Sequence, residues 1–461
     1  MLRVRPALPR SLPAAAALLA LPVAALAHAG ERMVILTLPT GRSIAAAGAT
    51  VALTAVVGLL FRRLPAPRPL LLLERRQLLP ETLPSWLGCA LLLALVATGF
   101  FGSRDPLANP LTLTVWTLVW VGLSLACLAF GDLFRPIDPW TGPVRLLRRW
   151  LGRSGGIGLA RLGAWPAAVG YLGFAWFEIV SLAPTDPAVL GRAVAGYWLL
   201  VLVLAVLEGE GWLRKGEAFC LYFAMIGRIA PLWTEVTGPR VRHFAGLPGT
   251  QVLAMPPLSP SAAAFVALVL ASVSFDGLSE TFRWLAFLGI NPLAFPGRSA
   301  VVLPNTLGLL AAWPVTLGLI LGAVALGRGL AGRRGRFWDD AGPWMLSFLP
   351  IAAGYHAAHY LVALLTDGQY AVAALNDPLG RGWSLLGLRP HWVSFGFLAD
   401  RGGVAAIWAA QVGLILGAHV LAVLLGLRLA GGSGLLHAPM TVLMVLYTVF
   451  GLWLLSAAAG A

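Results

Sequence analysis

The chain has 461 residues, of which 59% are hydrophobic and only 11% are charged, and its mean hydropathy is +0.82. Soluble domains carry about 25% charged residues, so the composition excludes a large water-soluble core and indicates several membrane-spanning helices. The net charge of +14 fits either nucleic-acid binding or the basic cytoplasmic loops of a membrane protein, and the positions of the basic residues decide between them.

Residues 1–27 are predicted to be a secretory signal peptide. Arg3, Arg5 and Arg10 precede an apolar stretch, and Ala25-Leu26-Ala27 supplies a small-x-small cleavage pattern. The alternative is an uncleaved first helix. Cleavage would make His28 the mature N-terminus and leave residues 28–461 as a single all-α transmembrane domain.

Ten apolar stretches of about bilayer length follow and predict a polytopic helix bundle. They cover roughly 42–61, 85–102, 112–134, 162–183, 188–207, 260–276, 302–326, 343–366, 404–427 and 439–457. A further apolar run at 217–233 carries Arg228 and Pro231 near its end. We interpret it as a re-entrant, interfacial or buried half-helix that does not cross.

The basic residues fit this topology when residue 28 lies outside. The loops that are then cytoplasmic hold more than twice as many Arg and Lys residues as the outer loops. This bias predicts a multi-pass protein of a bacterial inner membrane with both mature termini in the periplasm. The basic charge is thereby explained without nucleic acid, and the lipid bilayer is the predicted partner.

Polar residues at membrane depth collect in the predicted outer half of the spans. His356 and His359 lie three apart in GYHAAHYL (354–361), within about one helical turn. Asp276 and Glu280 lie in SFDGLSETFRW, and His419 lies deeper in LILGAHVLAV. Glu178 in GFAWFEIVSL is a further outer-half carboxylate. Ionisable groups in a membrane span need a partner or a wet cavity, so this cluster is the candidate site.

Histidine and carboxylate ligands suit a divalent metal such as Zn or Cu. The candidate metal ligands are His359, His419 and His356, with His28 as a further one, because a mature N-terminal histidine offers its amine and its imidazole together for copper. Asp276 and Glu280 are the candidate catalytic residues. The alternative for the histidines is hydrogen bonding between helices, and for the carboxylates it is pairing with Arg283 or helix capping.

Several stretches resemble a family of bacterial integral membrane proteins labelled fenitrothion hydrolase. They are SFDGLSETFRW (274–284), IAAGYHAAHYLVALLTDGQ (351–369), DPLGRGWSLLG (377–387), GAHVLAV (417–423), MTVLMVLYTVFGLWLLS (440–456), RLGAWPAAVG (161–170) and the AHAG start with LPTG at 38–41. In that family the histidine that matches His359 is typical, and the one that matches His356 is less so. The resemblance implies metal-dependent hydrolysis of an apolar organophosphorus triester, with water activated by the metal.

Three functions therefore remain open from the sequence. The first is a metal-dependent membrane hydrolase of organophosphorus-type esters with an apolar small-molecule substrate and a periplasm-facing His/Asp site. The second is a transporter or a metal-handling, for example copper-handling, membrane protein. The third is a non-catalytic subunit of a membrane complex, for which the sequence names no protein partner.

Overall fold

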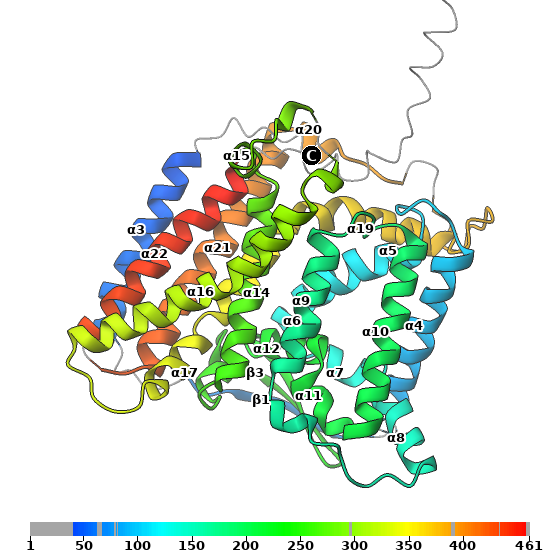
Figure 1. Cartoon of the computed structure of the whole chain (residues 1–461), viewed down its shortest axis with the longest axis horizontal. Coiled ribbons are helices and arrows are strands. Elements are labelled where there is room, and N and C mark those ends of the chain that lie inside the picture. Colours follow the sequence, from blue (N-terminus) through cyan, green and yellow to red (C-terminus); the bar gives the residue numbers. More distant parts are fainter. Residues whose placement is uncertain are drawn as a thin grey trace, which may run out of the picture.

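The structure is a computed structural model that describes residues 40–61, 67–77, 80, 82–294, 297–388, 392–432 and 434–457. Within these residues the protein is a bundle of long helices (Figure 1), which confirms the predicted all-α fold. The predicted signal peptide 1–27 and His28 lie outside the described residues.

Eight helices of the described chain are long and apolar enough to cross a membrane. They are α3 (Thr40–Phe61), α4 (Leu83–Phe101), the continuous run of α5 (Pro110–Leu113), η2 (Thr114–Leu123) and α6 (Ser124–Phe130), α10 (Pro187–Glu208), α14 (Pro260–Ser279), α16 (Val302–Leu330), α21 (Arg401–Leu429) and α22 (Gly434–Ser456). Each coincides with one of the predicted spans. These long apolar helices identify the chain as an integral membrane protein.

The other two predicted spans form helices that are shorter or bent. The stretch 162–183 forms α9 (Trp165–Ile179), whose 15 residues reach about 22 Å and fall short of a roughly 30 Å hydrocarbon core. The stretch 343–366 is divided among α17 (Trp338–Leu346), α18 (Leu349–His359) and α19 (Leu361–Asn376), with a 58° bend between the last two. The described residues therefore hold eight clear spans, or nine with the bent pair, rather than ten.

The apolar run 217–233 begins as a short buried helix, α12 (Ala218–Gly227), and its last residues enter a strand. Glu217 caps the helix by accepting hydrogen bonds from the backbone N–H groups of Phe219 and Cys220. Ten helical residues reach about 15 Å, which is too short to cross. Of the three alternatives left by the sequence, the buried half-helix describes α12 best.

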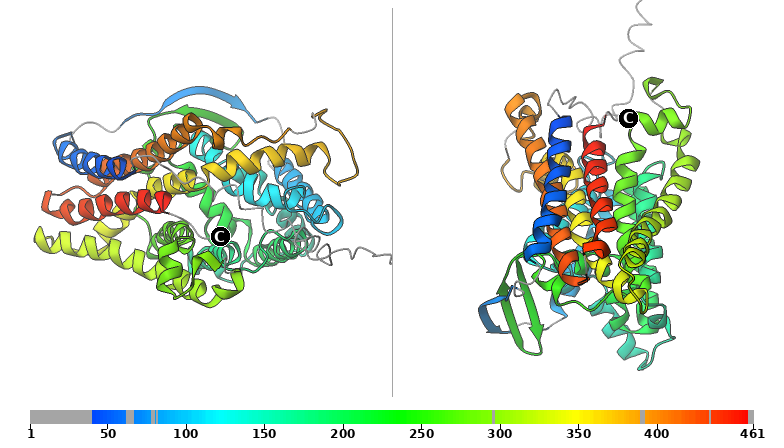
Figure 2. Two further views of the ribbon diagram at one scale, coloured as in Figure 1. Left: turned by 90° about the horizontal axis from the view of Figure 1, so that it is seen from above. Right: turned by 90° about the vertical axis from the view of Figure 1, so that its left-hand side faces the viewer.

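A three-stranded antiparallel sheet was not predicted from the sequence. Its order is β1 (Leu70–Arg76), β3 (Arg240–Ala245), β2 (Leu232–Thr237), and the Arg242 Nε atom lies 2.8 Å from Glu74 Oε2 across β1 and β3. Strand β1 follows α3, whereas β2 and β3 follow α12. The sheet therefore holds these two loops together at one end of the bundle, called here the sheet end (Figures 1 and 2).

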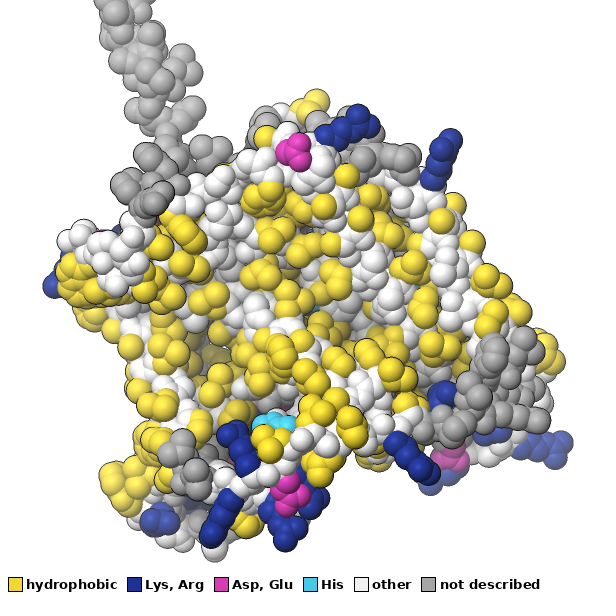
Figure 3. All heavy atoms as spheres, turned by 180° about the vertical axis from the view of Figure 1, so that it is seen from behind, with side chains coloured by type: hydrophobic (Ala, Val, Ile, Leu, Met, Phe, Trp, Pro, Cys, Tyr) yellow, Lys and Arg dark blue, Asp and Glu magenta, His cyan; other side chains and the backbone are white. Residues whose placement is uncertain are grey.

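Charge and apolar surface are separated along the bundle axis. Figure 3 shows apolar side chains over the middle of one face, with Lys and Arg gathered mainly at the sheet end and fewer at the opposite end. This pattern is typical of a membrane-embedded protein. It agrees with the basic loops that the sequence assigns to one side.

Short helices connect the long ones. They are α7 (Phe134–Ile137), α8 (Thr141–Trp150), η3 (Leu159–Leu162), η4 (Glu210–Trp212), α11 (Leu213–Gly216), α13 (Thr250–Leu253), α15 (Phe282–Phe287), η5 (Pro292–Ala294), η6 (Arg298–Ala300) and α20 (Gly396–Ala399). Helix α14 is the central helix. In its apolar stretch 78% of the residues are buried, whereas only 17% are buried in the apolar stretch of α16. Asp276 lies near the end of this central helix.

Candidate functional site

The candidate site is built around the break between α18 and α19. Helix α18 ends at His359, helix α19 begins at Leu361, and the chain changes direction at Tyr360. In a membrane, such breaks occur where the freed backbone is buried in protein or lines a cavity. The break places the side chains of His359 and Tyr360 against α14 and α9.

Four polar side chains form one hydrogen-bonded chain. His359 Nε2 lies 2.9 Å from Asp276 Oδ2, and the Tyr360 hydroxyl lies 2.8 Å from the same oxygen. The Tyr360 hydroxyl also lies 2.9 Å from Glu178 Oε1. The His359 and Asp276 side chains are only 16% and 14% exposed. The arrangement joins α9, α14 and the α18–α19 break through polar groups that lipid alone could not satisfy.

Counting protons in this chain assigns a role to each group. The Tyr360 hydroxyl has one proton but contacts two carboxyl oxygens, so both contacts are hydrogen bonds only when one carboxyl is protonated and donates to the phenol oxygen. The same Asp276 oxygen also contacts His359 Nε2, which donates to it when that nitrogen carries the ring proton. With the added proton on Glu178, the chain runs from Glu178 through Tyr360 to an ionised Asp276 paired with His359.

A cavity of about 120 Å³ lies beside this chain. It is lined by Pro106, Leu107, Thr112, Leu113, Trp116, Thr117, Trp120, Val121, Glu178, Pro184, Thr185, Asp276, Glu280, Arg298, His359, Tyr360, Ala363 and Asp367. The loops after α4, α9 and α14 contribute to this lining, so the cavity lies toward the end of the bundle opposite the sheet. This is the end that the sequence predicts to face the periplasm.

The aromatic wall of the cavity comes from η2, a ten-residue π-helical segment. π-Helical turns are rare and are frequent at functional sites, because the wider turn shifts the side chains that follow it. Trp116 and Trp120 lie on this segment, and the Trp116 indole N–H donates to the Pro184 carbonyl at 3.1 Å. Two irregular helices, one broken and one widened, therefore meet at the same cavity.

Arg298 fixes one edge of the cavity. Its Nη1 donates to the backbone carbonyls of Glu178 and Ser181, at 2.8 and 3.1 Å. Glu178 lies in the last turn of α9 and Ser181 just beyond it, where a cation is favourable both for unsatisfied carbonyl oxygens and for the helix dipole. Arg298 thereby holds the end of α9, and with it Glu178, against the site.

The structure brings together some of the residues that the sequence singled out. His359, Asp276 and Glu280 all line the cavity. His356 is not among the lining residues, is only 2% exposed, and its Nε2 lies 2.9 Å from the Trp120 carbonyl. It fits the alternative of a hydrogen-bonding histidine between helices.

His419 is buried away from the lining residues. Its Nδ1 lies 2.9 Å from the Ile415 carbonyl of its own helix, and within the described chain Nε2 has no hydrogen-bond partner. Its nearest aromatic neighbour is Tyr447, with ring centroids 6.4 Å apart. The structure therefore does not bring His419 together with His359 and Asp276.

Sequence reasoning missed three components of the site. It counted Glu178 among the outer-half polar residues but gave it no catalytic or metal-binding role, and it assigned no role to Tyr360 or Arg298. Tyr360 follows His359 directly in GYHAAHYL, and a tyrosine beside an intramembrane histidine was the available signal. Arg298 had no local signal, because its partners lie on α9, far away in the sequence.

The side chains at the cavity offer few ligands for a metal ion. Among the residues that the structure describes, no three His, Cys, Asp or Glu side chains are grouped so that they could hold a metal ion. The Tyr360 hydroxyl occupies the position between the carboxyl groups of Glu178 and Asp276. These residues do not fit a metal centre as they are arranged. Metal binding by His356, His359 and His419 stays a prediction, and His28 lies outside the described residues.

No protein-family model, curated protein or solved structure matches this chain.

Proposed function

We propose that this integral membrane protein carries out acid–base chemistry on a small molecule in the cavity, and that ester hydrolysis is the reaction the site supports best. The observation that carries the proposal is the hydrogen-bonded chain of Glu178, Tyr360, Asp276 and His359. It holds a proton donor and a proton acceptor side by side, as acid–base catalysis requires.

In this proposal His359 is the general base. Its Nε2–H is held by Asp276, so Nδ1 is the basic ring nitrogen and takes a proton from a water molecule that attacks the ester. The carboxylate of Asp276 orients the imidazole and stabilises the imidazolium that forms. This is the role of the carboxylate in hydrolases with a His–Asp pair.

Glu178 and Tyr360 supply the proton for the leaving group. The Tyr360 hydroxyl donates to the departing oxygen and is reprotonated by Glu178. The cycle closes when the imidazolium releases its Nδ1 proton to water in the cavity, which restores the neutral His359 whose Nε2–H is held by Asp276. Glu178, which also lines the cavity, takes a proton back from this water, so every group returns to its starting state.

The volume of the cavity limits the size of the substrate group that can enter it. Its volume of about 120 Å³ is below the roughly 300–1,000 Å³ of sites that enclose a drug-sized ligand. An aryl phosphotriester such as fenitrothion would place its reacting group in the cavity and its apolar part outside. The resemblance to the fenitrothion hydrolase family supports ester hydrolysis, and Trp116 and Trp120 supply an apolar wall for such a group.

Proton-linked transport is the second candidate, and the broken helix favours it. Transporters bind substrates at discontinuous helices near the membrane midplane, and buried Asp, Glu and His side chains form their proton relays. A transporter would move a solute across proteoliposomes when a pH gradient is applied. A hydrolase would convert its substrate in detergent, with no gradient.

The test is ester turnover by the purified protein in lipid nanodiscs, with chromogenic carboxylic esters and phosphotriesters. We expect His359→Gln to lower turnover about 10²- to 10⁴-fold, the usual contribution of a general base. The matched control is His356→Gln, one turn away, which should keep turnover while lowering thermal stability. Turnover should also survive a chelator, whereas loss on chelation would favour the metal-dependent alternative. Unchanged turnover in His359→Gln would contradict the proposal.

A further inference from the structure

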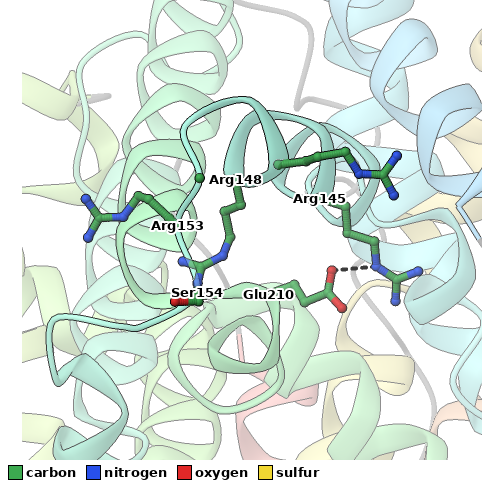
Figure 4. Close-up of a pocket in the computed structure, with 7 residues that line it drawn as sticks. Arg145, Arg148, Arg153, Ser154 and Glu210 are labelled. Carbon is green, nitrogen blue, oxygen red and sulfur yellow. Dashed lines mark hydrogen bonds and ion pairs between the residues drawn. The ribbon is translucent and has the colours of Figure 1, made fainter.

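A second hollow lies at the sheet end, far from the cavity described above. It has a volume of about 410 Å³ and is lined by Arg145, Arg148, Arg149, Gly152, Arg153, Ser154 and Glu210. Figure 4 shows Arg145, Arg148 and Arg153 around it, with Glu210 facing Arg145. Four arginines and one carboxylate give this arginine pocket a formal charge of +3.

Backbone carbonyls hold two of the arginines in place. Arg148 donates from Nη1 to the Val206 carbonyl at 2.7 Å and from Nη2 to the Gly155 carbonyl at 3.1 Å. Arg153 donates from Nη2 to the Leu207 carbonyl at 3.4 Å. The carbonyls of Val206 and Leu207 belong to the last turn of α10, where cations are favoured. The pocket is therefore preformed by the protein.

The arginines of the pocket have further N–H donors for an anion. A guanidinium has five N–H donors, of which the hydrogen bonds above use two in Arg148 and one in Arg153. Glu210 is the only carboxylate among the lining residues, and its Oε2 lies 2.5 Å from Arg145 Nε. Planar guanidinium groups suit the paired oxygens of a phosphate.

The pocket lies at the membrane surface. The spanning helix α10 ends at Glu208, two residues before Glu210, so the arginines are at headgroup depth. Large apolar side chains beside them face outward, since Trp150 is 74% exposed and Leu151 is 63% exposed. Arginine next to exposed Trp and Leu is the pattern of a segment that lies in the membrane interface.

We propose that the arginine pocket binds the phosphate headgroup of an anionic membrane lipid. The four arginines surround the phosphate, and Trp150 and Leu151 insert beside the acyl chains. Glu210 weakens the site by neutralising Arg145. This proposal is independent of the proposed acid–base function, because none of its residues lines the other cavity.

The test is lipid binding by the purified full chain in neutral phosphatidylcholine nanodiscs, titrated with phosphatidylglycerol and read by native mass spectrometry. The pocket variant is Arg149→Gln with Arg153→Gln. At about 1 kcal/mol for each basic residue near an anionic surface, the two changes should weaken binding about 30-fold. The matched control is Arg334→Gln with Arg336→Gln, which removes the same charge from exposed residues of the α16–α17 loop. It should change binding much less than the pocket variant does, because neither residue lines the pocket.

A second variant distinguishes loss of the lipid site from loss of the fold. Glu210→Gln should raise lipid affinity because it removes the negative charge among the lining residues, and a damaged fold would not produce a gain. Equal losses in the pocket variant and the control would overturn the proposal, because binding would then follow net charge alone. Inorganic phosphate that displaces the lipid at equal concentration would overturn the lipid assignment and make the site one for free phosphate.

Discussion

The hydroxyl of Tyr360 provides a sharp test of the site, because helix α18, which ends just before it, offers a matched control. Tyr360→Phe removes one oxygen, and with it the contacts of 2.8 Å to Asp276 and 2.9 Å to Glu178. Tyr355→Phe removes the same atom five residues earlier. Within the described chain the buried Tyr355 hydroxyl has no hydrogen-bond partner.

The two substitutions should have opposite effects on stability. A hydrogen bond contributes about 1 kcal/mol between neutral groups and about 1.5–3 kcal/mol to a charged group, so Tyr360→Phe should lower the free energy of unfolding by roughly 2.5–4 kcal/mol. Tyr355→Phe removes a buried group that is not satisfied. It should leave stability unchanged or raise it by up to about 1 kcal/mol.

Unfolding in mixed micelles with increasing denaturing detergent, followed by tryptophan fluorescence, measures both free energies under one condition. The difference between the two variants should exceed about 2 kcal/mol, with Tyr360→Phe less stable. Equal free energies for the two variants would refute the hydrogen-bonded chain, because Tyr355→Phe removes no hydrogen bond of this kind.

Three further predictions concern other parts of the fold. A Cβ at Gly354 would lie 2.4 Å from Ala418 Cβ, so Gly354→Ala should cost about 1–3 kcal/mol, whereas Gly318→Ala, with open space around it, should raise thermal stability slightly. Asp340 is 1% exposed and pairs with two arginines, so Asp340→Asn should cost about 3–5 kcal/mol in the same unfolding assay. Backbone N–H groups hold the pKa of Asp377 below its ordinary 3.8, so its loop should be protected from hydrogen exchange above about pH 4 and lose protection as pH falls further.

The helical fold could be predicted from the sequence because each span is a continuous apolar stretch of about bilayer length. All ten predicted stretches form helices in the described chain, but α9 is too short to cross and the stretch 343–366 is divided among α17, α18 and α19. The sheet could not be predicted in the same way. Strand β1 pairs with β3 about 170 positions away, and LLLLERR carries no local signal that separates a strand from the end of a loop.

The sequence predicts how deep in the membrane each site residue lies, but not which neighbouring helix its side chain faces. The position of His359, Asp276 and His419 along their spans gives their depth, whereas the rotation of each helix decides which neighbours a side chain contacts. His356 and His359 differ by about 60° around one helix. That difference directs His356 to the Trp120 carbonyl and His359 to Asp276. The break at Tyr360 depends on tertiary packing and left no pattern in the sequence.

The proposed acid–base site requires a proton on Glu178 that is donated to Tyr360. Infrared spectroscopy of the full chain in nanodiscs measures it directly, because a protonated carboxyl group has its own carbonyl stretching band. We predict a band of this kind at neutral pH that is lost in Glu178→Gln and shifted in Tyr360→Phe, with Asp367→Asn as the control that leaves it in place. A spectrum of Glu178→Gln that is identical to that of the parent protein would contradict the proposed acid–base site.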